Sequence, residues 1–298
     1  MKKIHDDFLK PPQQQLNNLI KYYQAGRYVD AEKLSLSITQ EFPKHQFAWK
    51  VLAVLLKRNG RINESLIVSK KSVQLDPQDA EAHNNLGVLL QEQGKLYEAE
   101  KSHRKAIELK PDYAEAHNNL GNTLKQQDKL DGAEKCYKKV ITLKPDYAKA
   151  HNNLGILLKE QGRIKEAEAS YAQAIKLKPD YAEAHYNLGV LLQEEERLDE
   201  AETSYNHALA LKPDFTDALQ NRWMILFSQK RYEIALKDAD LITSKVNRAF
   251  DLITLYALGR TDEIYKRIET QSNIDSENLD QVNDLNKSEE PNKDDEIS

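Results

Sequence analysis

The pentapeptide His83-Asn84-Asn85-Leu86-Gly87 decides the fold, because it returns at a fixed interval. It recurs unchanged at 117–121 and 151–155 and with one substitution at 185–189, so each step is 34 residues. A fixed period of this length indicates stacked copies of one supersecondary unit. Prolines keep the same spacing through less similar sequence, at Pro43, Pro77, Pro111, Pro145, Pro179 and Pro213. In this register seven repeats begin, at residues 12, 46, 80, 114, 148, 182 and 216.

Each repeat has the hydrophobic pattern of two antiparallel helices. In the repeat 80–113, Leu86 and Leu90 lie four residues apart, and a second apolar stripe follows Gly94 with a 3.6-residue period. Gly94 therefore predicts the turn between the helices. The same place holds Asp128, Glu196 and Lys230 in other repeats, so we expect that this turn does not strictly require a positive φ.

Other repeated residues predict how the helices pack and end. Glycine inside a helix costs about 1 kcal/mol relative to alanine, so the recurrence of Gly87 predicts a close approach of the second helix. We expect its partner to be Ala99, twelve residues later. Each repeat's proline should end the second helix. The segments 112–115 and 180–183 read Asp-Tyr-Ala-Glu, which predicts capping boxes at the start of the next helix.

These features resemble the tetratricopeptide repeat family over residues 12–249. Counted from the first residue of each repeat, leucine and glycine take the seventh and eighth places, alanine the twentieth, tyrosine the twenty-fourth and proline the thirty-second. The fourth place, often tryptophan in the family, is Trp49 in one repeat and histidine in the next four. The resemblance implies an all-α fold, a right-handed superhelical solenoid of antiparallel helix pairs.

The sequence as a whole predicts four segments. An N-terminal arm (1–11) precedes the seven repeats (12–249), and a shortened helical unit (250–270) is expected to cap the last apolar face. The tail 271–298 has few apolar residues, so we expect it to be disordered.

Composition limits the partner classes. The whole chain has a net charge of −5, of which residues 275–298 contribute −7, so residues 1–274 carry about +2 without a basic stripe. This argues against nucleic-acid binding. No apolar run is long enough to span a bilayer, and the first ten residues lack the apolar core of a secretory signal. The single Cys136 excludes a framework of intrachain disulfides. We therefore expect a cytoplasmic protein with no membrane contact.

A column of asparagines is the clearest functional signal. By resemblance to the family, the second, fifth, sixth, ninth, twelfth and thirteenth places project into a concave groove. Asparagine is a mediocre helix former, but its amide can pair with both the C=O and the N–H of an extended peptide. We therefore predict a peptide-binding ladder, which resembles the one in O-linked N-acetylglucosamine transferases. The sixth place holds Asn17, Asn85, Asn119, Asn153, Asn187 and Asn221, and only Val51 interrupts the column.

A simpler interpretation is that recent duplication copied solvated surface residues. It weakens at Asn17 and Asn221, because their repeats have lost the surrounding pentapeptide. Glutamates at the second and thirteenth places and lysines at the twelfth suggest a mild preference for basic ligands, although a solvated face explains them more simply.

Metal and catalytic sites are not expected. His83, His117, His151 and His185 hold one place in successive repeats. Helices pack about 8–10 Å apart, which is too far for one zinc ion to be shared between them. Cys136 stands where other repeats have serine. No catalytic motif or phosphate-binding glycine loop is present, so we expect no cofactor and no enzyme activity.

Three functions remain open at this stage. The favoured one is a scaffold that binds extended segments of other proteins. The second is the substrate-recognition arm of a glycosyltransferase or another transferase whose catalytic domain is not in this chain. The third is a clamp for the C-terminal carboxylate of chaperones; Lys50 and Asn85 fit its pattern, but Val54, Glu115 and Asn119 do not. The sequence leaves the partner and the oligomeric state open.

Overall fold

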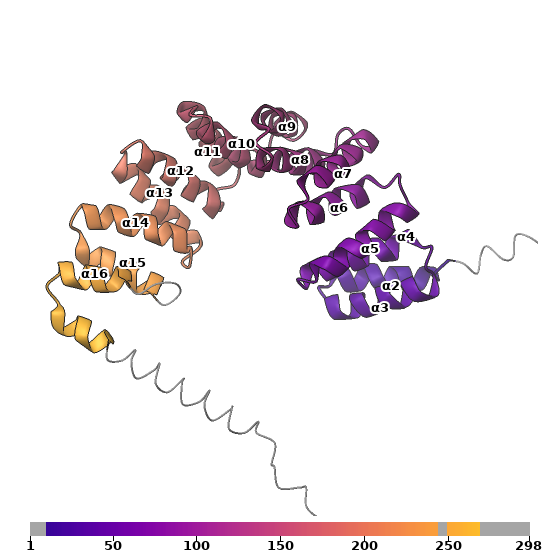
Figure 1. Cartoon of the computed structure of the whole chain (residues 1–298), viewed down its shortest axis with the longest axis horizontal. Helices are drawn as coiled ribbons and strands as arrows, with labels where there is room; N and C mark the ends of the chain where they lie inside the picture. The colour runs from indigo at the N-terminus through magenta and orange to yellow at the C-terminus, as the bar shows by residue number, and fades with distance from the viewer. Residues whose placement is uncertain (1–9, 244–248, 269–298) are drawn as a thin grey trace, which may run out of the picture. The chain divides into compact units, whose positions relative to one another are not determined.

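The computed structural model describes residues 10–243 and 249–268, and all regular structure in these ranges is helical (Figure 1). The predicted arm (1–11) and acidic tail (271–298) lie almost wholly outside the described residues. The helices form pairs in the predicted register: α2 (Gln13–Gln24) with α3 (Tyr28–Glu41), α4 (Gln46–Arg58) with α5 (Ile62–Leu75), α6 (Ala80–Glu92) with α7 (Leu96–Leu109), α8 (Ala114–Gln126) with α9 (Leu130–Leu143), α10 (Ala148–Glu160) with α11 (Ile164–Leu177), α12 (Ala182–Glu194) with α13 (Leu198–Leu211), and α14 (Thr216–Ser228) with α15 (Tyr232–Thr243).

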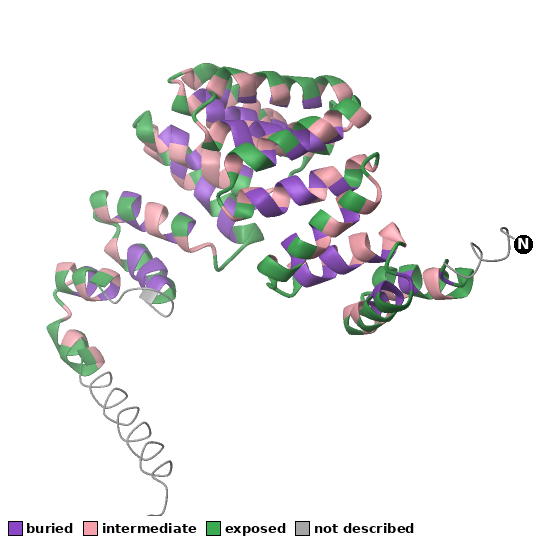
Figure 2. Ribbon diagram, turned by 45° about the vertical axis from the view of Figure 1, so that its right-hand side comes forward, coloured by how far each residue is buried: buried purple, intermediate pink, exposed green. Residues whose placement is uncertain are grey.

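The chain divides into two compact units, residues 1–179 and 180–298. In the first unit each helix packs on its partner and on the next pair, and the first helices α4, α6, α8 and α10 also contact one another in turn. In the second unit α12 to α15 continue the pairing, and α16 (Ala249–Ala257) packs on α15. Buried residues gather between neighbouring helices, and exposed ones cover the outside (Figure 2).

The C-terminal segment is anchored by an aromatic cluster. The Trp223 indole donates to Thr254 Oγ1 at 2.9 Å and meets the Phe250 ring edge-on at 4.7 Å. A further helical stretch covers 261–268. The segment expected to act as a cap therefore packs on the last described pair through α16.

The turn within each pair requires a left-handed residue, so the sequence-based expectation for it was wrong. Gly94 has φ 71°, and Lys95 N–H donates to Leu90 C=O while Gly94 N–H donates to Gln91 C=O. These two bonds form a Schellman motif, which needs positive φ at the residue after the cap. Asp128, Glu196 and Lys230 adopt φ 60° at the same place. The backbone bonds impose the conformation even where the side chain disfavours it.

The recurrent helical glycine makes room for an aromatic ring, not for alanine. A Cβ added to Gly121 would lie 2.6 Å from the buried Tyr137 ring, and the glycines in the pairs Gly155–Tyr171 and Gly189–Tyr205 are equally close to their rings. The predicted close approach is confirmed, but the partner is the twenty-fourth place and not the twentieth. Two other repeats reverse the sizes, with the pairs Leu19–Ser35 and Trp223–Ala239 at these two places, whereas Ala53 and Ser69 of the second repeat are both small. Except in the second repeat, one shared volume is thus filled from either helix.

The predicted capping boxes are absent. α8 begins at Ala114 with Tyr113 as its N-cap, and α12 begins at Ala182 with Tyr181 as its N-cap; neither has a side-chain cap. Each helix starts one residue later than the box requires, so Asp112 and Asp180 lie outside it. In α6 an aspartate does hold the capping position, where Asp79 accepts from Ala82 N–H at 3.0 Å.

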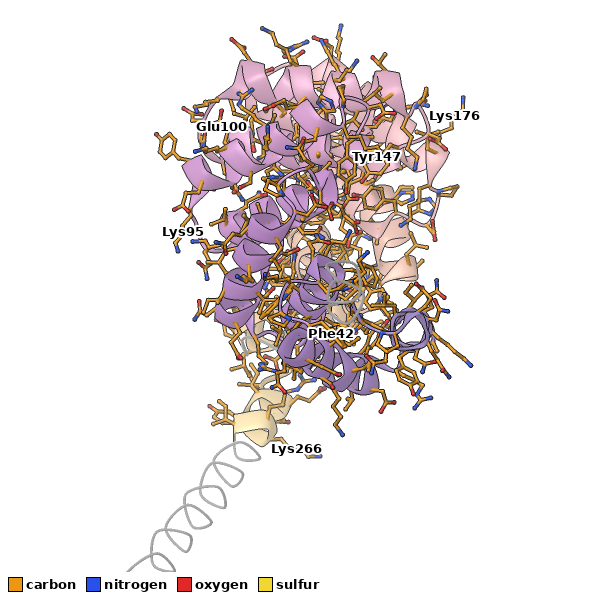
Figure 3. The ribbon with its side chains drawn as sticks, turned by 90° about the vertical axis from the view of Figure 1, so that its right-hand side faces the viewer. Phe42, Lys95, Glu100, Tyr147, Lys176 and Lys266 are labelled. Carbon is orange, nitrogen blue, oxygen red and sulfur yellow. The ribbon has the colours of Figure 1, made fainter. Side chains whose placement is uncertain are left out.

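Surface charges cover the second helices. Lys95, just before α7, and Lys176, on α11, are exposed (Figure 3). Arginine or lysine at the sixteenth place reaches back to a glutamate of the preceding repeat, as in Arg163–Glu134 and Lys129–Glu100, each at 2.8 Å. Because such exposed pairs contribute at most about 1 kcal/mol, the buried volume between helices dominates the stability.

Substituting Glu196→Gly should raise the free energy of unfolding by about 1 kcal/mol, because it removes the penalty of a left-handed non-glycine residue. The exposed side chain offers little contact to lose. Urea denaturation followed by circular dichroism measures the effect. Gly94→Ala is the matched control and should lower the midpoint, whereas equal midpoints for wild type and Glu196→Gly would contradict the argument.

Acid should destabilise the third repeat through His103. This ring is fully buried, its Nδ1 donates to Asn84 Oδ1 at 3.1 Å, and burial lowers its pKa from 6.5 to about 4. Below pH 6.5 the unfolded chain binds a proton that the folded chain rejects, so stability present above pH 6.5 is lost as the pH falls towards 4. The full loss is about 3 kcal/mol.

His103→Tyr should remove this pH dependence, because Tyr205 already fills the same place. The Tyr205 hydroxyl donates to Gln193 Oε1 at 2.7 Å. In the third repeat Gln91 occupies the place that corresponds to Gln193, so it can accept from a tyrosine at position 103. Thermal melts between pH 7 and 4 provide the measurement. His117→Trp serves as the control, since Trp49 shows that tryptophan fits there, and it should keep the wild-type pH dependence.

Candidate functional site

Two hollows in the first unit lie on one side of the first helices. The larger, of about 410 Å³, is lined by Ile20 and Tyr23 of α2, Phe47 and Val51 of α4, and Glu81 of α6. The smaller, of about 190 Å³, is lined by Lys57 of α4, Asn85 of α6 and Glu115 of α8, and also by Ser65 and Ser69 of α5. Val54 belongs to the wall of both.

These linings bring together the second, sixth, ninth and twelfth places of consecutive first helices. We call this surface, formed by α2, α4, α6 and α8, the first-helix face. Val54 contributes to both hollows, and together the linings include residues of four consecutive first helices. An extended polypeptide fits such a shape better than a compact small molecule does.

The predicted asparagines differ in exposure. Asn17 is exposed and accepts from Gln13 Nε2 at 3.0 Å. Asn85, Asn119 and Asn153 are half-buried in the first unit. Asn187 and Asn221 are half-buried in the second. The sixth place is therefore neither wholly solvated nor closed off.

Two of the asparagines already bind the neighbouring repeat. Asn119 Nδ2 donates to Asn84 Oδ1 at 3.1 Å, and Asn153 Nδ2 donates to Asn118 Oδ1 at 3.0 Å and to Asn122 Oδ1 at 3.1 Å. Among the described residues, the Oδ1 atoms of Asn119 and Asn153 accept no hydrogen bond. These amides thus tie repeats together through their nitrogen and keep an acceptor for a ligand N–H.

Asn221 and Asn85 behave differently. Asn221 Nδ2 donates to the hydroxyl of Tyr205 at 3.2 Å, so this amide also supports its own unit. Asn85 makes no hydrogen bond through its side chain with the described residues and lines the smaller hollow. It has the most hydrogen-bonding capacity left for a ligand.

The fifth place is buried in the central repeats and does not project into the groove as the resemblance implied. Asn84 and Asn118 are at most 1% exposed. Adjacent helical residues point about 100° apart, so a side chain next to the sixth place turns into the gap between hairpins. In the sequence, the Asn-Asn doublet was the signal that one place is buried and the next is not, because adjacent side chains on a helix point in different directions.

Lysines and glutamates on the face largely neutralise each other. Lys57 pairs with Glu92 at 2.7 Å, and Lys125 pairs with Glu160 at 2.6 Å. Each pair links the twelfth place to the thirteenth place of the next repeat. This arrangement reduces the free charge that a ligand meets.

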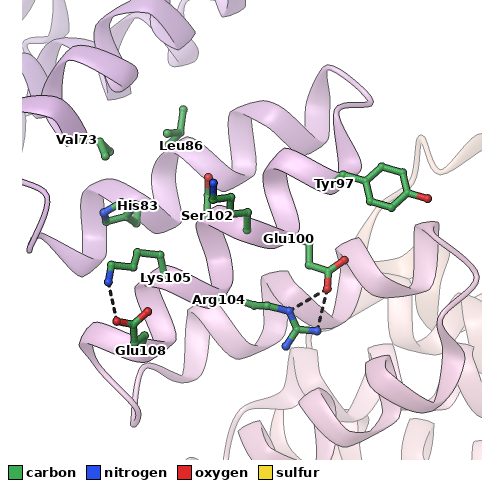
Figure 4. A pocket seen from close by; sticks show the side chains of 10 residues that line it. Val73, His83, Leu86, Tyr97, Glu100, Ser102, Arg104, Lys105 and Glu108 are labelled. Carbon is green, nitrogen blue, oxygen red and sulfur yellow. Dashed lines mark hydrogen bonds and ion pairs between the residues drawn. The ribbon is translucent and has the colours of Figure 1, made fainter.

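A third hollow, of about 640 Å³, lies on the other side, along α7 (Figure 4). Its lining includes Tyr97 and two ion pairs, Arg104–Glu100 at 2.8 Å and Lys105–Glu108 at 2.6 Å. The charged side chains in these ion pairs neutralise one another. This hollow therefore has less unpaired polarity to offer a ligand than its volume suggests.

The repeated histidines have a structural role. Nε2 of His83, His117 and His151 lies 2.9–3.2 Å from the carbonyl of the proline six residues earlier. Trp49 Nε1 donates to Pro43 C=O in the same way at 3.0 Å. A ring N–H is what the fourth place supplies, which explains why histidine replaces the family's tryptophan.

Reactive groups are few in the part of the chain that the structure describes. Burial raises the pKa of the Cys136 thiol to about 11, which opposes a nucleophilic role. No group of three or more His, Cys, Asp or Glu side chains is placed to hold a metal ion within residues 10–243 and 249–268. None of the described helices combines the length and apolarity that a bilayer span requires.

Sequence comparison identifies the repeats. Profiles described as "Tetratricopeptide repeat" match residues 80–113, 104–135 and 182–215, and one described as "TPR repeat" matches 121–162 and 157–195. Residues 80–215 therefore consist of tetratricopeptide repeats. No curated protein sequence matches the chain significantly.

Solved structures share the fold. A tetratricopeptide repeat protein from Parabacteroides merdae is 17% identical, covers 82% of this chain and 98% of its own, and has a TM-score of 0.65. A chain of the APC/C hetero-tetramer Cut9–Hcn1 is 18% identical, with 80% and 48% covered and a TM-score of 0.67. Pseudomonas aeruginosa pilF is 19% identical, with 76% and 97% covered and a TM-score of 0.57. At these identities the likeness concerns the fold, and it confirms the predicted all-α solenoid of helix pairs.

The asparagines should differ in their effect on stability. Asn153→Ala removes two donated bonds and leaves the buried Asn118 amide short of a partner, so it should cost about 1–3 kcal/mol. Asn85→Ala should stay within about 0.5 kcal/mol of wild type. Chemical denaturation of both variants makes the comparison. Equal losses would show that the inter-repeat bonds carry no net stability.

Proposed function

We propose that this chain is a non-enzymatic scaffold that holds extended segments of other proteins along its first-helix face. The observation that carries the proposal is the pair of hollows that meet at Val54. Their walls come from successive repeats, as a ligand running across the repeats requires. Both apolar and polar side chains line them, which suits peptide side chains of mixed character.

The asparagines supply the main-chain grip in this proposal. An extended peptide presents one N–H and one C=O per residue, and outside a sheet these groups need partners. Asn85 has both its carbonyl and its amino group available, whereas Asn119 and Asn153 each offer the carbonyl oxygen. We assign Asn17, Asn187 and Asn221 to the same ladder; Oδ1 of Asn17 already accepts from Gln13, so its Nδ2 is the group that it offers.

The proposed ladder differs in chemistry from the one expected from the sequence. Donors at Asn119 and Asn153 hold the neighbouring repeat, so these residues favour ligand N–H groups over ligand C=O groups. The same amides therefore serve both ligand binding and the packing of neighbouring repeats. A ligand N–H that donates to Oδ1 leaves the inter-repeat bonds in place, so the face already has its binding geometry before the ligand binds.

The transferase alternative uses the same face. An array that presents protein substrates to a glycosyltransferase would bind them in the same way and differ only in what it is attached to. A catalytic partner that co-purifies with the array would favour this alternative, and it would leave the binding mode unchanged.

Selection of peptides from a random phage-displayed library on the full-length protein tests the proposal. Selected peptides should bind Asn85→Ala and Asn119→Ala about tenfold more weakly than wild type by fluorescence anisotropy, since each loses about 1 kcal/mol or more of hydrogen bonding. Lys101→Ala, on α7 beside the third hollow, should bind normally. Binding lost in Lys101→Ala and retained in both asparagine variants would place the site on the other side and refute the proposal.

A further inference from the structure

Three departures from the repeat pattern meet in the larger hollow. The sixth place is Val51 where every other repeat has asparagine. The second place is Phe47, where three later repeats have glutamate. The twelfth place is Tyr23, where later repeats mainly have lysine or glutamine. Each change replaces a polar side chain by a large apolar one, and all three line the same hollow.

The apolar lining is left accessible. Ile20 is 40% exposed and Tyr23 is 39% exposed, although both lie beside the apolar cluster of the first two pairs. If Ile20 and Tyr23 served only to cap the end of the array, we would expect their apolar side chains to be buried. A hollow of about 410 Å³ is within the range of about 300–1,000 Å³ that is usual for ligand sites. It has room for one bulky apolar side chain.

The charge beside this hollow is negative and partly unpaired. The Lys50 ammonium contacts Asp79 at 3.0 Å and Glu81 at 2.8 Å, so it is already neutralised. Lys57 is paired with Glu92. Glu115, which lines the adjoining hollow, is exposed and has no ion pair among the described residues. A ligand cation is therefore favoured next to the apolar site.

We propose that this end of the first-helix face is a specificity site for an extended segment in which a large aliphatic or aromatic residue neighbours a lysine or arginine. The apolar side chain enters the hollow at Val51, and the basic one reaches Glu115 across the shared wall at Val54. The inference rests on the proposed function and adds which side chains are selected. The asparagines bind the main chain of any extended peptide, whereas the site at Val51 selects for particular side chains.

The peptide selection described above also tests this inference. Wild-type protein should enrich peptides with a large apolar residue beside a basic one. Selection on Val51→Asn should enrich peptides without the apolar preference. Because asparagine fills this place in the other repeats, the substitution is compatible with the fold, and circular dichroism checks this. Tyr23→Ser, at an exposed position in the same hollow, is a second variant.

Affinities measured with one selected peptide separate the contributions. Val51→Asn should weaken binding about tenfold, as expected for loss of a buried apolar contact. Replacing the peptide's apolar residue by alanine should weaken wild-type binding similarly, with little further loss in Val51→Asn. Glu115→Gln should weaken binding about two- to fivefold, and only for peptides that retain the basic residue. Ile67→Asn, an equivalent exchange at an exposed position on α5, should have no effect.

The outcomes distinguish the two proposals. Peptides whose affinity falls in Asn85→Ala but not in Val51→Asn or Tyr23→Ser would overturn the specificity site and leave the scaffold function standing. Failure to enrich any peptide that depends on the first-helix face would overturn both. Enrichment of acidic peptides by the wild-type protein would also overturn the inference.

Discussion

The filling of one volume between the two helices of each pair is the constraint on which the structure depends. A glycine in the first helix admits an aromatic ring from the second, as at Gly121 and Tyr137, or a larger residue in the first helix meets a small one in the second. Close packing then sets the distance between the helices. Within each unit, neighbouring pairs pack on one another in the same register, so equivalent places recur on successive first helices.

That regular stacking explains why the asparagine amides have two partners. The fifth place turns into the gap between hairpins, and the sixth lies at its edge, so Asn119 can donate to Asn84 across the gap. Between α6 and α8 and between α8 and α10, this bond satisfies the fifth-place oxygen and a sixth-place donor, whereas Nδ2 of Asn84 and of Asn118 is buried without a hydrogen-bond partner among the described residues. The Oδ1 atoms of Asn119 and Asn153 remain as acceptors. The proposed grip on a ligand main chain thus derives from the contacts that hold the repeats in line.

A regular array presents the same residues in every repeat. Selection of particular ligand side chains therefore requires repeats that differ from the pattern. The first two repeats supply them, since Tyr23, Phe47 and Val51 converge on one apolar hollow beside an unpaired Glu115. A chain built only from the central repeats would bind main chain without selecting side chains. The same reasoning separates the first-helix face from the hollow on α7, where Arg104 and Lys105 are satisfied by their own glutamates.

The sequence by itself determined the period, the helix pairs and their register, because periodicity and proline spacing are local properties of the chain. It also located the sixth-place asparagines. Only the tertiary structure decided that His103 or Tyr137 packs on the helical glycine, that Asp128 and Glu196 adopt positive φ, and that Asn84 is buried. These features depend on which side chain fills the space between two helices and on backbone bonds that close a turn. Contacts between the two helices of a pair set the first and local backbone bonds across the turn set the second, and the identity of a single residue reveals neither.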